Sequence, residues 1–460
     1  MRLDESLLKK MVSDAVLVQG QLEGDLFFSV DSRTIQSDEL FVPLYGENVD
    51  GHTFLAQALE KGKGSFIAYE QKELLSFLPA SLLKNKIIIM VRDVKEAFIA
   101  IAHAWRMRYT FPVVGITGSI GKTSTKALIA TIMMRAGKNY FCAYGNQNTL
   151  IGIALNIARL HDKHEGAIFE MGIQKRGEMD PMAALLQPTT AVITYIGHSH
   201  MEWLGGVAGI AAEKRNIFKY FKDGNIGVIN GDQLVLSSVG YAHPVVKFGH
   251  KITNQVQVRK IQIIDDHIEC VFKIYGEKFS LSVPTVHEGM INNMLAAASV
   301  ACVLNVPYSV IIDALQEPVV SARRFESCPL KKYQGLMIDD AYNASPESMK
   351  AALLAFELLK ASGKKIAILG DMLELGQTSS FWHRQLGRFL RKVPTLKHLI
   401  LVGDQVQWIK QTAPITLDVV HVASWQDAVE KLKEKLDPGS VVLVKGSRGM
   451  KLNNLVQEFI

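Results

Sequence analysis

Short apolar runs separated by polar turns follow one another along the whole chain. Near the N-terminus, DLFFSV (25–30) and ELFVPL (39–44) flank the polar turn DSRTIQSD, and KIIIMV (86–91) comes later. Short runs rich in β-branched and aromatic residues are typical of strands. Residues 1–108 are therefore expected to form a first domain of the α+β type.

A strand–loop–helix unit opens the middle part of the chain. The apolar run FPVVGIT (111–117) precedes a glycine-rich loop, and KTSTKALIATIMMRAG (122–137) carries apolar residues at helical spacing, with Gly137 as the expected cap. Further strand candidates are GAIFEMG (166–172), TAVITYI (190–196) and NIGVIN (225–230). This alternation predicts a mostly parallel sheet with helices on its faces over residues 109–316.

Three apolar runs in the last third of the chain each end at a glycine. They are KIAILG (365–370), HLILVG (398–403) and SVVLVKG (440–446), with helical stretches between them. This pattern predicts an open, doubly wound, Rossmann-like α/β domain, in which ligands bind at the carboxyl ends of the strands. The expected linker is LQEPVVSARRFES (315–327), so the third domain is expected to cover residues 317–460.

The composition is that of an ordinary globular protein, and it disfavours several classes. Lys and Arg number 51 against 45 Asp and Glu, and no run of five basic residues occurs, so no nucleic-acid partner is expected. No apolar run approaches the roughly 18 residues of a membrane span, and the N-terminus MRLDESLLKKMVSD lacks the apolar core of a signal peptide. We therefore expect a cytoplasmic protein.

The stretch VGITGSIGKTS (114–124) resembles a phosphate-binding loop with an unusual glycine spacing. The strict motif G-x-x-x-x-G-K-[ST] would need a glycine at position 116, where the chain has Ile116. Glycines before a helix let backbone amides approach phosphate oxygens, and the helix N-terminus adds partial positive charge. Lys122 could then reach the β- and γ-phosphates, and the Thr123 hydroxyl could bind Mg²⁺. The sequence predicts a variant nucleotide site, and the alternative is a chance glycine-rich turn.

Other side chains are candidate partners of such a site. Glu170 ends the run GAIFE, where a carboxylate can face phosphates and a metal ion. His198 and His200 stand in GHSHMEW (197–203), and a histidine at a strand end can bind a metal or a phosphate. Without further support, lone histidines are more often structural, and Lys214 in AAEKRNIF is typical of the solvated face of a helix.

These motifs together resemble those of the Mur ligases, the ATP-dependent amide-forming enzymes of peptidoglycan precursor synthesis. That family has T-G-x-x-G-K-T in place of the strict loop, which accounts for the glycine spacing. DSRTIQSDELFVPLYGENVDGHTFLAQAL (31–59) is similar to the family's uridine-binding domain, and GNQNTLIGIALNI (145–157) to its G-N-x-N-x-x-I-G block. The branch that adds D-Ala-D-Ala is matched by DDAYNASPESMKAAL (339–353), AILGDMLELG (367–376) and VLVKGSRGMKLNNLV (442–456).

The resemblance assigns a role to each matching position. For ATP, the matching residues are Gly118, Ser119, Ile120, Gly121, Lys122, Thr123 and Ser124 in the loop, with Asn293, Arg324 and Asp340 elsewhere. For two Mg²⁺ ions, they are Thr123, Glu170, His200 and Lys214, the last as a carbamylated lysine. For the UDP-linked substrate, they are Ser32, Arg33, Asp50, Gly51, His52, Asn146, Asn148 and Thr149. The catalytic set would be Lys122, Glu170, His200 and Lys214.

The chain departs from the family pattern at four places, one of which is the G-R-x-E block, which here reads Arg323-Arg324-Phe325-Glu326. Ile120 stands where the family often has Asn, and Asn216 where Glu usually follows the lysine. Gly289 and Met290 replace the usual H-N before the asparagine, with His287 displaced from that position. These changes affect the expected adenine pocket and the surroundings of Lys214.

The resemblance implies a ligase that uses ATP to join the carboxylate of UDP-MurNAc-tripeptide to D-Ala-D-Ala through an acyl phosphate. A monomer is expected. A sister ligase remains open, either the enzyme that adds the third residue or a folylpolyglutamate synthase. A P-loop NTPase that acts as a switch is a different class, and it leaves the segment DSR to DGH (31–52) unexplained. A non-catalytic nucleotide-binding module gives the lysine, threonine and acidic candidates no role.

Overall fold

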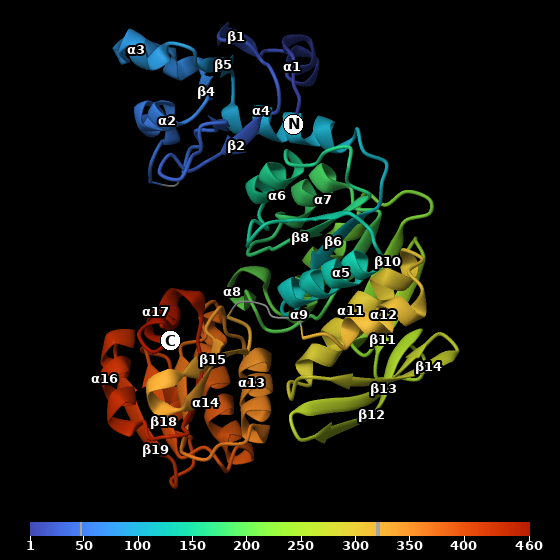
Figure 1. Ribbon diagram of the computed structural model, residues 1–460, viewed down its shortest axis with the longest axis vertical. Coiled ribbons are helices and arrows are strands. Elements are labelled where there is room, and N and C mark those ends of the chain that lie inside the picture. Colours follow the sequence, from blue (N-terminus) through green and yellow to red (C-terminus); the bar gives the residue numbers. More distant parts are fainter. Residues whose placement is uncertain (47, 319–322) are drawn as a thin grey trace. The chain divides into compact units, whose positions relative to one another are not determined.

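The computed structural model describes residues 1–46, 48–318 and 323–460, which divide into two compact units. One unit contains Met1–Gly115, Asn139–Gly172 and Asp180–Pro188, and the other contains Ile116–Lys138, Ile173–Met179 and Thr189–Ile460. Three β-sheets with flanking helices form the frame of the described chain (Figure 1). Residues 319–322 of the expected linker lie outside the described residues.

The first sheet has five strands in the order β1-β5-β4-β3-β2. The strands are β1 (Val16–Gln19), β2 (Phe27–Ser29), β3 (Glu39–Phe41), β4 (Gly64–Ala68) and β5 (Ile87–Val91). Its helices are α1 (Glu5–Met11), α2 (Leu55–Lys61), α3 (Ala80–Leu83) and α4 (Val94–Arg106). Strands β2 to β5 are joined by parallel pairings, and β1 pairs antiparallel with β5. The three strands predicted in this part are confirmed as β2, β3 and β5.

The second sheet has nine strands in the order β14-β13-β12-β11-β10-β9-β6-β8-β7. They are β6 (Val113–Thr117), β7 (Tyr140–Cys142), β8 (Gly166–Glu170), β9 (Thr190–Ile193), β10 (Ile226–Asn230), β11 (Val245–Gly249), β12 (Val256–Ile264), β13 (His267–Ile274) and β14 (Glu277–Val283). All residues of β6, β8 and β9 are buried, as expected of strands covered on both faces. The four predicted strands, here β6, β8, β9 and β10, are confirmed.

An antiparallel extension of this sheet was not predicted. Strands β12, β13 and β14 pair antiparallel in chain order, and β13 alternates strictly between buried and half-buried residues. Such alternation is typical of a strand with one covered face. The short apolar runs used for prediction do not detect it, because three of the four half-buried residues of β13 are polar or charged.

The helices of the middle part include the one predicted after the glycine-rich loop. They are α5 (Lys122–Arg135), α6 (Leu150–Ile157), α7 (Met179–Leu186), α8 (Met201–Leu204), α9 (Val207–Arg215), α10 (Leu234–Ser237), α11 (Gly289–Val303) and α12 (Tyr308–Leu315). Gly137 has φ +68° just beyond the C-cap Ala136, so glycine ends α5 as predicted.

The third sheet has the order β15-β16-β20-β17-β18-β19 and is parallel except for β15. Its strands are β15 (Glu326–Leu330), β16 (Gly335–Asp340), β17 (Lys365–Gly370), β18 (His398–Val402), β19 (Asp418–Val422) and β20 (Val441–Lys445). Its helices are α13 (Pro346–Leu358), α14 (Ser379–Phe389), α15 (Gln407–Lys410), α16 (Trp425–Lys435) and α17 (Leu452–Gln457).

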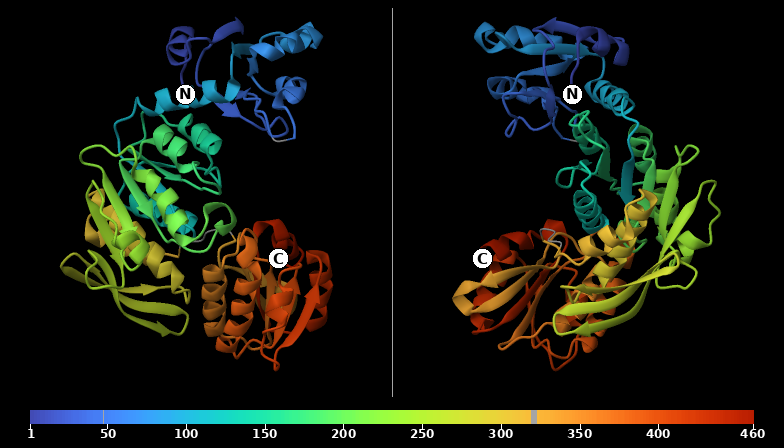
Figure 2. Two further views of the ribbon diagram at one scale, coloured as in Figure 1. Left: turned by 180° about the vertical axis from the view of Figure 1, so that it is seen from behind. Right: turned by 45° about the vertical axis from the view of Figure 1, so that its right-hand side comes forward.

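Helices cover both faces of this third sheet (Figure 2). Leu369 of β17 belongs to the core beneath α13 and α14, whereas its neighbour Ile368 belongs to the core beneath α16 and α17. Successive residues of a strand point to opposite faces, so β17 is buried from both sides. The predicted doubly wound fold is confirmed.

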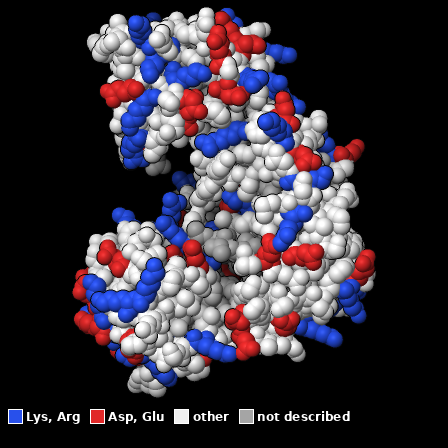
Figure 3. Space-filling view, viewed as in Figure 1, with Lys and Arg blue, Asp and Glu red and all other residues white. Residues whose placement is uncertain are grey.

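In the described ranges, no helix combines the length and apolar character needed to cross a bilayer. On the face drawn in Figure 3, lysine and arginine side chains are interspersed with aspartate and glutamate side chains. This mixture agrees with a formal net charge of only +6 on 460 residues.

His164, which precedes β8, makes the stability of the folded protein depend on pH. Its Nδ1 accepts a hydrogen bond of 3.2 Å from the amide of His161, and its ring stacks on His161 and packs against Phe141. Burial, followed by the charge of His161, lowers the pKa of His164 from 6.5 to about 4. The folded state therefore favours the neutral imidazole.

We predict that His164→Gln reduces the loss of stability in mild acid. Above pH 6.5 both folded and unfolded forms of this group are neutral. As the pH falls from 6.5 towards 4, the unfolded chain takes up a proton that the folded chain resists, so wild type loses stability that the variant retains. The melting temperatures of wild type, His164→Gln and the exposed control His250→Gln should be compared across this range. Equal pH dependence in all three would contradict the prediction.

Candidate functional site

The glycine-rich loop between β6 and α5 requires glycine at two positions. Gly121 directly precedes α5 and has φ +84°, in the left-handed region. A Cβ at Gly121 would collide with Oδ1 of Asn293, and one at Gly118 would collide with the hydroxyl of Thr194. The close packing lets the chain turn sharply into α5, whose first amides point towards the loop. An anion can therefore be bound there.

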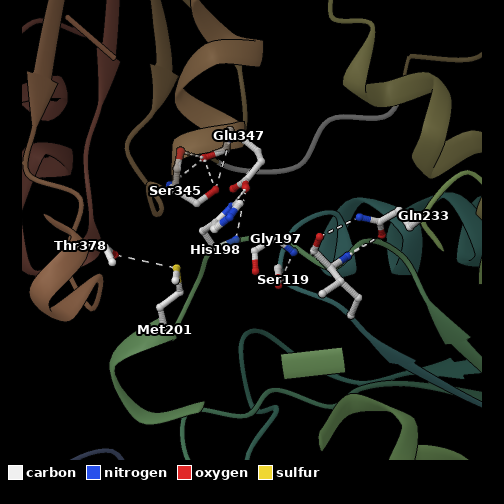
Figure 4. A network of polar contacts seen from close by, with 10 residues as sticks. Ser119, Gly197, His198, Met201, Gln233, Ser345, Glu347 and Thr378 are labelled. Carbon is white, nitrogen blue, oxygen red and sulfur yellow. Dashed lines mark hydrogen bonds and ion pairs between the residues drawn. The ribbon is translucent and has the colours of Figure 1, made fainter. Parts of the chain in front are cut away.

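Hydrogen bonds attach the loop to the chain that follows β9. The Thr194 hydroxyl donates to the carbonyl of Ile120 at 2.6 Å, and the Ser119 amide donates to the carbonyl of Tyr195 at 2.7 Å. The Ser119 hydroxyl donates to the carbonyl of Gly197 at 3.2 Å and accepts from its amide at 3.0 Å (Figure 4). We call these five residues the loop clamp. The clamp therefore turns the carbonyl of Ile120 towards the end of β9 and holds Ser119 through both its amide and its hydroxyl.

The loop clamp accounts for the unusual residue at the tip of the loop. Ile120 joins the clamp through its backbone carbonyl, and its side chain is half-buried. Isoleucine can therefore replace asparagine without loss of this contact. Gln233, the N-cap residue of α10, supports the neighbouring chain, because its side-chain amide exchanges two hydrogen bonds of 2.7 Å with the backbone of Ile196 (Figure 4).

Lys122 and Lys214 lie close enough for their charges to interact. The Lys122 ammonium donates to the carbonyl of Gly118 at 2.7 Å, so this side chain folds back across the loop. Lys214 on α9 is only 1% exposed, so its interpretation as a solvated helix lysine is wrong. Burial lowers the pKa of Lys214 well below its usual range, and Lys122 lowers it further, while Glu213 opposes the shift.

Arg324 reaches the loop from the segment before β15. Its guanidinium donates to the Thr123 hydroxyl at 2.7 Å and lies 4.3 Å from the centre of the Tyr342 ring. Asp340, at the end of β16, forms a buried ion pair of 2.8 Å with Lys445 and accepts from the amide of Phe325. Arg324 therefore meets the loop as expected, whereas the carboxylate of Asp340 is engaged with Lys445.

The two histidines after β9 both contact carboxylates. His200 has φ +62° at the start of α8, and its Nδ1 lies 2.5 Å from Oε2 of Glu374. His198 donates its amide to Oε1 of Glu347 at 3.2 Å, and its Nδ1 also contacts that carboxylate (Figure 4). The ring of His198 packs on Trp382. These contacts give His198 a structural role, as is usual for a lone histidine.

Glu170 ends β8 and is buried, with 3% of its surface exposed. Within the described ranges, no group of three His, Cys, Asp or Glu side chains is arranged to hold a metal ion. Mg²⁺ often keeps waters and binds one or two carboxylates together with phosphate oxygens. A site completed by a nucleotide therefore does not require such a group.

A cleft of about 760 Å³ lies in the N-terminal part of the chain. Ser32, Arg33 and Gly51 line it, whereas Asp50 and His52 are not among its lining residues. His52 Nδ1 contacts Asp50 at 2.7 Å, and its Nε2 accepts from the amide of Ala68 at 3.1 Å. Both ring nitrogens of His52 thus have partners within the fold, and these contacts hold the segment next to Gly51 in place.

The remaining expected substrate residues precede α6. Asn148 donates to the side chain of Asn146 at 2.8 Å, and Thr149 caps the helix through the amide of Gly152. Asn146 and Thr149 are exposed, and Asn148 is half-buried. Sequence reasoning missed Thr194, Gln233 and Glu374, although Thr194 is a polar residue that directly follows a buried strand.

The fold and loop define a class: an α/β nucleotide-binding protein with a phosphate loop between a buried strand and a helix. Residues 116–301 match the model of the Mur ligase middle domain, and residues 323–448 match that of the Mur ligase glutamate ligase domain. The chain belongs to the Mur ligase family.

Individual members of the family are similar to this chain over nearly its whole length. The chain is 31% identical to UDP-N-acetylmuramoyl-tripeptide–D-alanyl-D-alanine ligase of Bacillus subtilis (strain 168), over 99% of either protein. The crystal structure of MurF from Acinetobacter baumannii has a TM-score of 0.84 and 25% identity, over 98% of this chain and 97% of that one. MurF ligase from Thermotoga maritima in complex with ADP shares the fold, with a TM-score of 0.78 and 24% identity over 94% and 96% of the two chains.

We predict that Thr194→Val weakens ATP binding about tenfold. The variant leaves the part-buried carbonyl of Ile120 without this donor, which costs about 1–1.5 kcal/mol, and 1.4 kcal/mol corresponds to about a factor of ten. Titration with a fluorescent ATP analogue measures the effect. Thr190→Val, a buried threonine at the other end of β9, is the matched control. An unchanged affinity, or an equal loss in both variants, would count against the loop clamp.

Proposed function

We propose that this protein is an ATP-dependent ligase that joins D-Ala-D-Ala to UDP-MurNAc-tripeptide and so forms the UDP-MurNAc-pentapeptide of peptidoglycan synthesis. The observation that carries the proposal is the clamped phosphate loop, with Lys122 and Thr123 at the start of α5. The full-length similarity to ligases of this specificity supports the choice of substrates.

The reaction must activate a carboxylate, because a carboxylate is a poor electrophile towards an amine in water. A carboxylate oxygen of the tripeptide attacks the γ-phosphorus of ATP, the bond to the bridging oxygen breaks, and ADP leaves. The amine of D-Ala-D-Ala then attacks the carbonyl carbon of the acyl phosphate. Phosphate leaves with the original carboxylate oxygen, and the amine loses a proton. No nucleophile from the protein is needed.

The loop and its lysine would supply positioning and positive charge. The amides at the start of α5 would bind the phosphates, and Lys122 would swing from the Gly118 carbonyl to the β- and γ-phosphates. Asn293, which lies against Gly121, would contact the adenine side of the nucleotide. Arg324, which lies in the expected linker, would exchange its contact with Thr123 for one with the nucleotide.

Two Mg²⁺ ions would neutralise phosphate charge and orient the γ-phosphoryl group. The residues that would hold them are Thr123, Glu170, His200 and carbamylated Lys214. Thr123 fits this role, because its hydroxyl already presents an oxygen lone pair to the cationic Arg324 at 2.7 Å.

Lys214 suits carbamylation because its amine is buried and its pKa is lowered. The neutral amine attacks the carbon of CO₂ and loses a proton, which converts a buried amine into a carboxylate-like ligand. The product would contribute oxygen atoms to a metal ion and would reverse the local charge beside Lys122.

The cleft near the N-terminus would bind the UDP part of the substrate. Arg33 is held at its rim by two hydrogen bonds to Asp31, of 2.8 and 2.7 Å, and carries a charge that suits a diphosphate. Ser32, whose hydroxyl donates to Gln57 at 2.7 Å, provides a polar wall. Asn146, Asn148 and Thr149 would contact the muramoyl peptide.

The three-domain division at 1–108, 109–316 and 317–460 belongs to this proposal. Each sheet lies within one of these ranges, and the two family matches, 116–301 and 323–448, fall within the second and third. A cytoplasmic monomer also stays a prediction, since nucleotide-linked substrates and ATP are cytoplasmic metabolites and each proposed site uses residues of one chain.

We predict that Lys122→Ala lowers the rate of ligation about 100- to 1,000-fold, as expected when one charge-stabilising group is removed. Binding of the UDP-tripeptide should change little, because Ser32 and Arg33 are unaffected. Phosphate release with D-Ala-D-Ala, meso-diaminopimelate, lysine or glutamate as the amine measures both activity and specificity. The exposed Lys222→Ala controls for loss of a lysine. Unchanged turnover of Lys122→Ala would refute the loop assignment, and a preference for another amine would identify a sister ligase.

We predict that Lys214→Ala loses activity and regains part of it with acetate or formate. A small carboxylate can enter the space left by the side chain and replace the carbamate oxygens. In wild type supplied with ¹³C-labelled bicarbonate, a carbamate resonance should appear in the ¹³C spectrum and be absent from Lys214→Ala. Full activity of the variant without additive, together with no carbamate resonance in wild type, would show that Lys214 is not modified.

A further inference from the structure

Glu374, which no part of the proposed mechanism uses, contacts the side chain of His200. Its Oε2 lies 2.5 Å from Nδ1 of His200, whose side chain is only 16% exposed. Both residues have positive φ, +64° for Glu374 and +62° for His200. Such backbone conformations are uncommon for residues with a side chain and persist only where surrounding contacts maintain them. The pair is therefore held by backbone constraints on both sides.

The segment that carries Glu374 docks on α8 through several further contacts. The carbonyl of Glu374 accepts from the amide of Glu202 at 3.4 Å, and the hydroxyl of Thr378 contacts the sulfur of Met201 at 4.0 Å (Figure 4). Gly376, with φ +53°, lies so close to Glu202 that a Cβ would come within 3.3 Å of its side chain. Glu374 thus approaches His200 from a segment fixed in its own right.

The geometry determines which nitrogen of His200 is free. Nδ1 makes no regular hydrogen bond among the described residues, but a carboxylate oxygen 2.5 Å away would repel its lone pair, so the charge of Glu374 favours the neutral tautomer with the proton on Nδ1. The lone pair then lies on Nε2, the nitrogen that can bind a metal ion. Histidine ligands of metals commonly donate their other nitrogen to a carboxylate, which fixes the tautomer and orientation and raises the basicity of the ligand.

We propose that Glu374 is a positioning residue that holds His200 in the Nε2 lone-pair tautomer for Mg²⁺ binding. This inference rests on the proposed function of His200. It gives the segment Leu373–Thr378 a role in assembling the metal site: the ligand comes from the chain after β9, and the group that orients it comes from the loop after β17.

The same region supplies a matched control. His198 and Glu347 also form a histidine–carboxylate pair between the chain after β9 and the third-sheet region, with Glu347 in the first turn of α13. His198 is packed against Trp382 and is not an expected metal ligand. Glu347→Gln therefore removes a similar charge and a similar contact without affecting a ligand.

The test measures metal binding and tautomer as well as activity. Mn²⁺ binding in the presence of a non-hydrolysable ATP analogue is followed by electron paramagnetic resonance in wild type, Glu374→Gln, Glu374→Ala and Glu347→Gln. We expect Mn²⁺ affinity to fall about 10- to 100-fold in both Glu374 variants and to stay unchanged in Glu347→Gln. The ¹⁵N resonances of His200, assigned by their loss in His200→Gln, should report the Nδ1–H tautomer in wild type and a mixture in Glu374→Ala.

The outcomes separate this inference from the proposed function. If His200→Gln weakens Mn²⁺ binding but the Glu374 variants do not, His200 is a ligand and the positioning role is refuted. Equal weakening in Glu347→Gln would also overturn the inference, because loss of the contact between the two regions would then explain the effect. If His200→Gln itself leaves Mn²⁺ binding unchanged, the assignment of His200 fails and the role of Glu374 fails with it. Melting temperatures identify any variant that is misfolded. If one of the two Glu374 variants is misfolded, the Mn²⁺ affinity of the other one tests the inference.

Discussion

The hydrogen bond from Thr194 to the carbonyl of Ile120 is the interaction on which the site depends. It lies at the centre of the loop clamp, where Gly118 packs so closely on Thr194 that no side chain fits. A loop that binds phosphate through backbone amides must turn its carbonyls away from the ligand. The Thr194 hydroxyl does this for the carbonyl of Ile120, and the contacts of Ser119 hold the neighbouring residue in place, so this part of the loop is preorganised for an anion.

The same short stretch of chain links the loop to the third-sheet region. Thr194 and Gly197 belong to the loop clamp, and His198 and His200 follow directly and contact Glu347 and Glu374. Within this unit, a few consecutive residues therefore connect the phosphate loop to α13 and to the segment after β17. This continuity gives a physical basis for coordinating the phosphate site with the groups that surround the metal ligands.

Much of the fold and part of the site could be predicted from the sequence, for reasons that particular residues illustrate. Buried parallel strands such as β17 are continuous apolar runs, and Gly137 ends α5 where a cap was expected. The strand β13 was not predicted because polar residues interrupt its sequence and leave no apolar run longer than three residues. Local motifs located Lys122 and Thr123, but the burial of Lys214 and the contact of Glu374 with His200 depend on segments distant in the sequence. Periodicity does not report on such contacts.

The central claim is that the protein activates a carboxylate by phosphoryl transfer from ATP. The most direct test uses UDP-MurNAc-tripeptide whose reacting carboxylate is labelled with ¹⁸O, together with ATP and D-Ala-D-Ala. The mechanism predicts phosphate release only when both substrates are present, with one labelled oxygen carried into each phosphate and one retained in the new amide. Unlabelled phosphate, or phosphate released at the same rate without D-Ala-D-Ala, would contradict it.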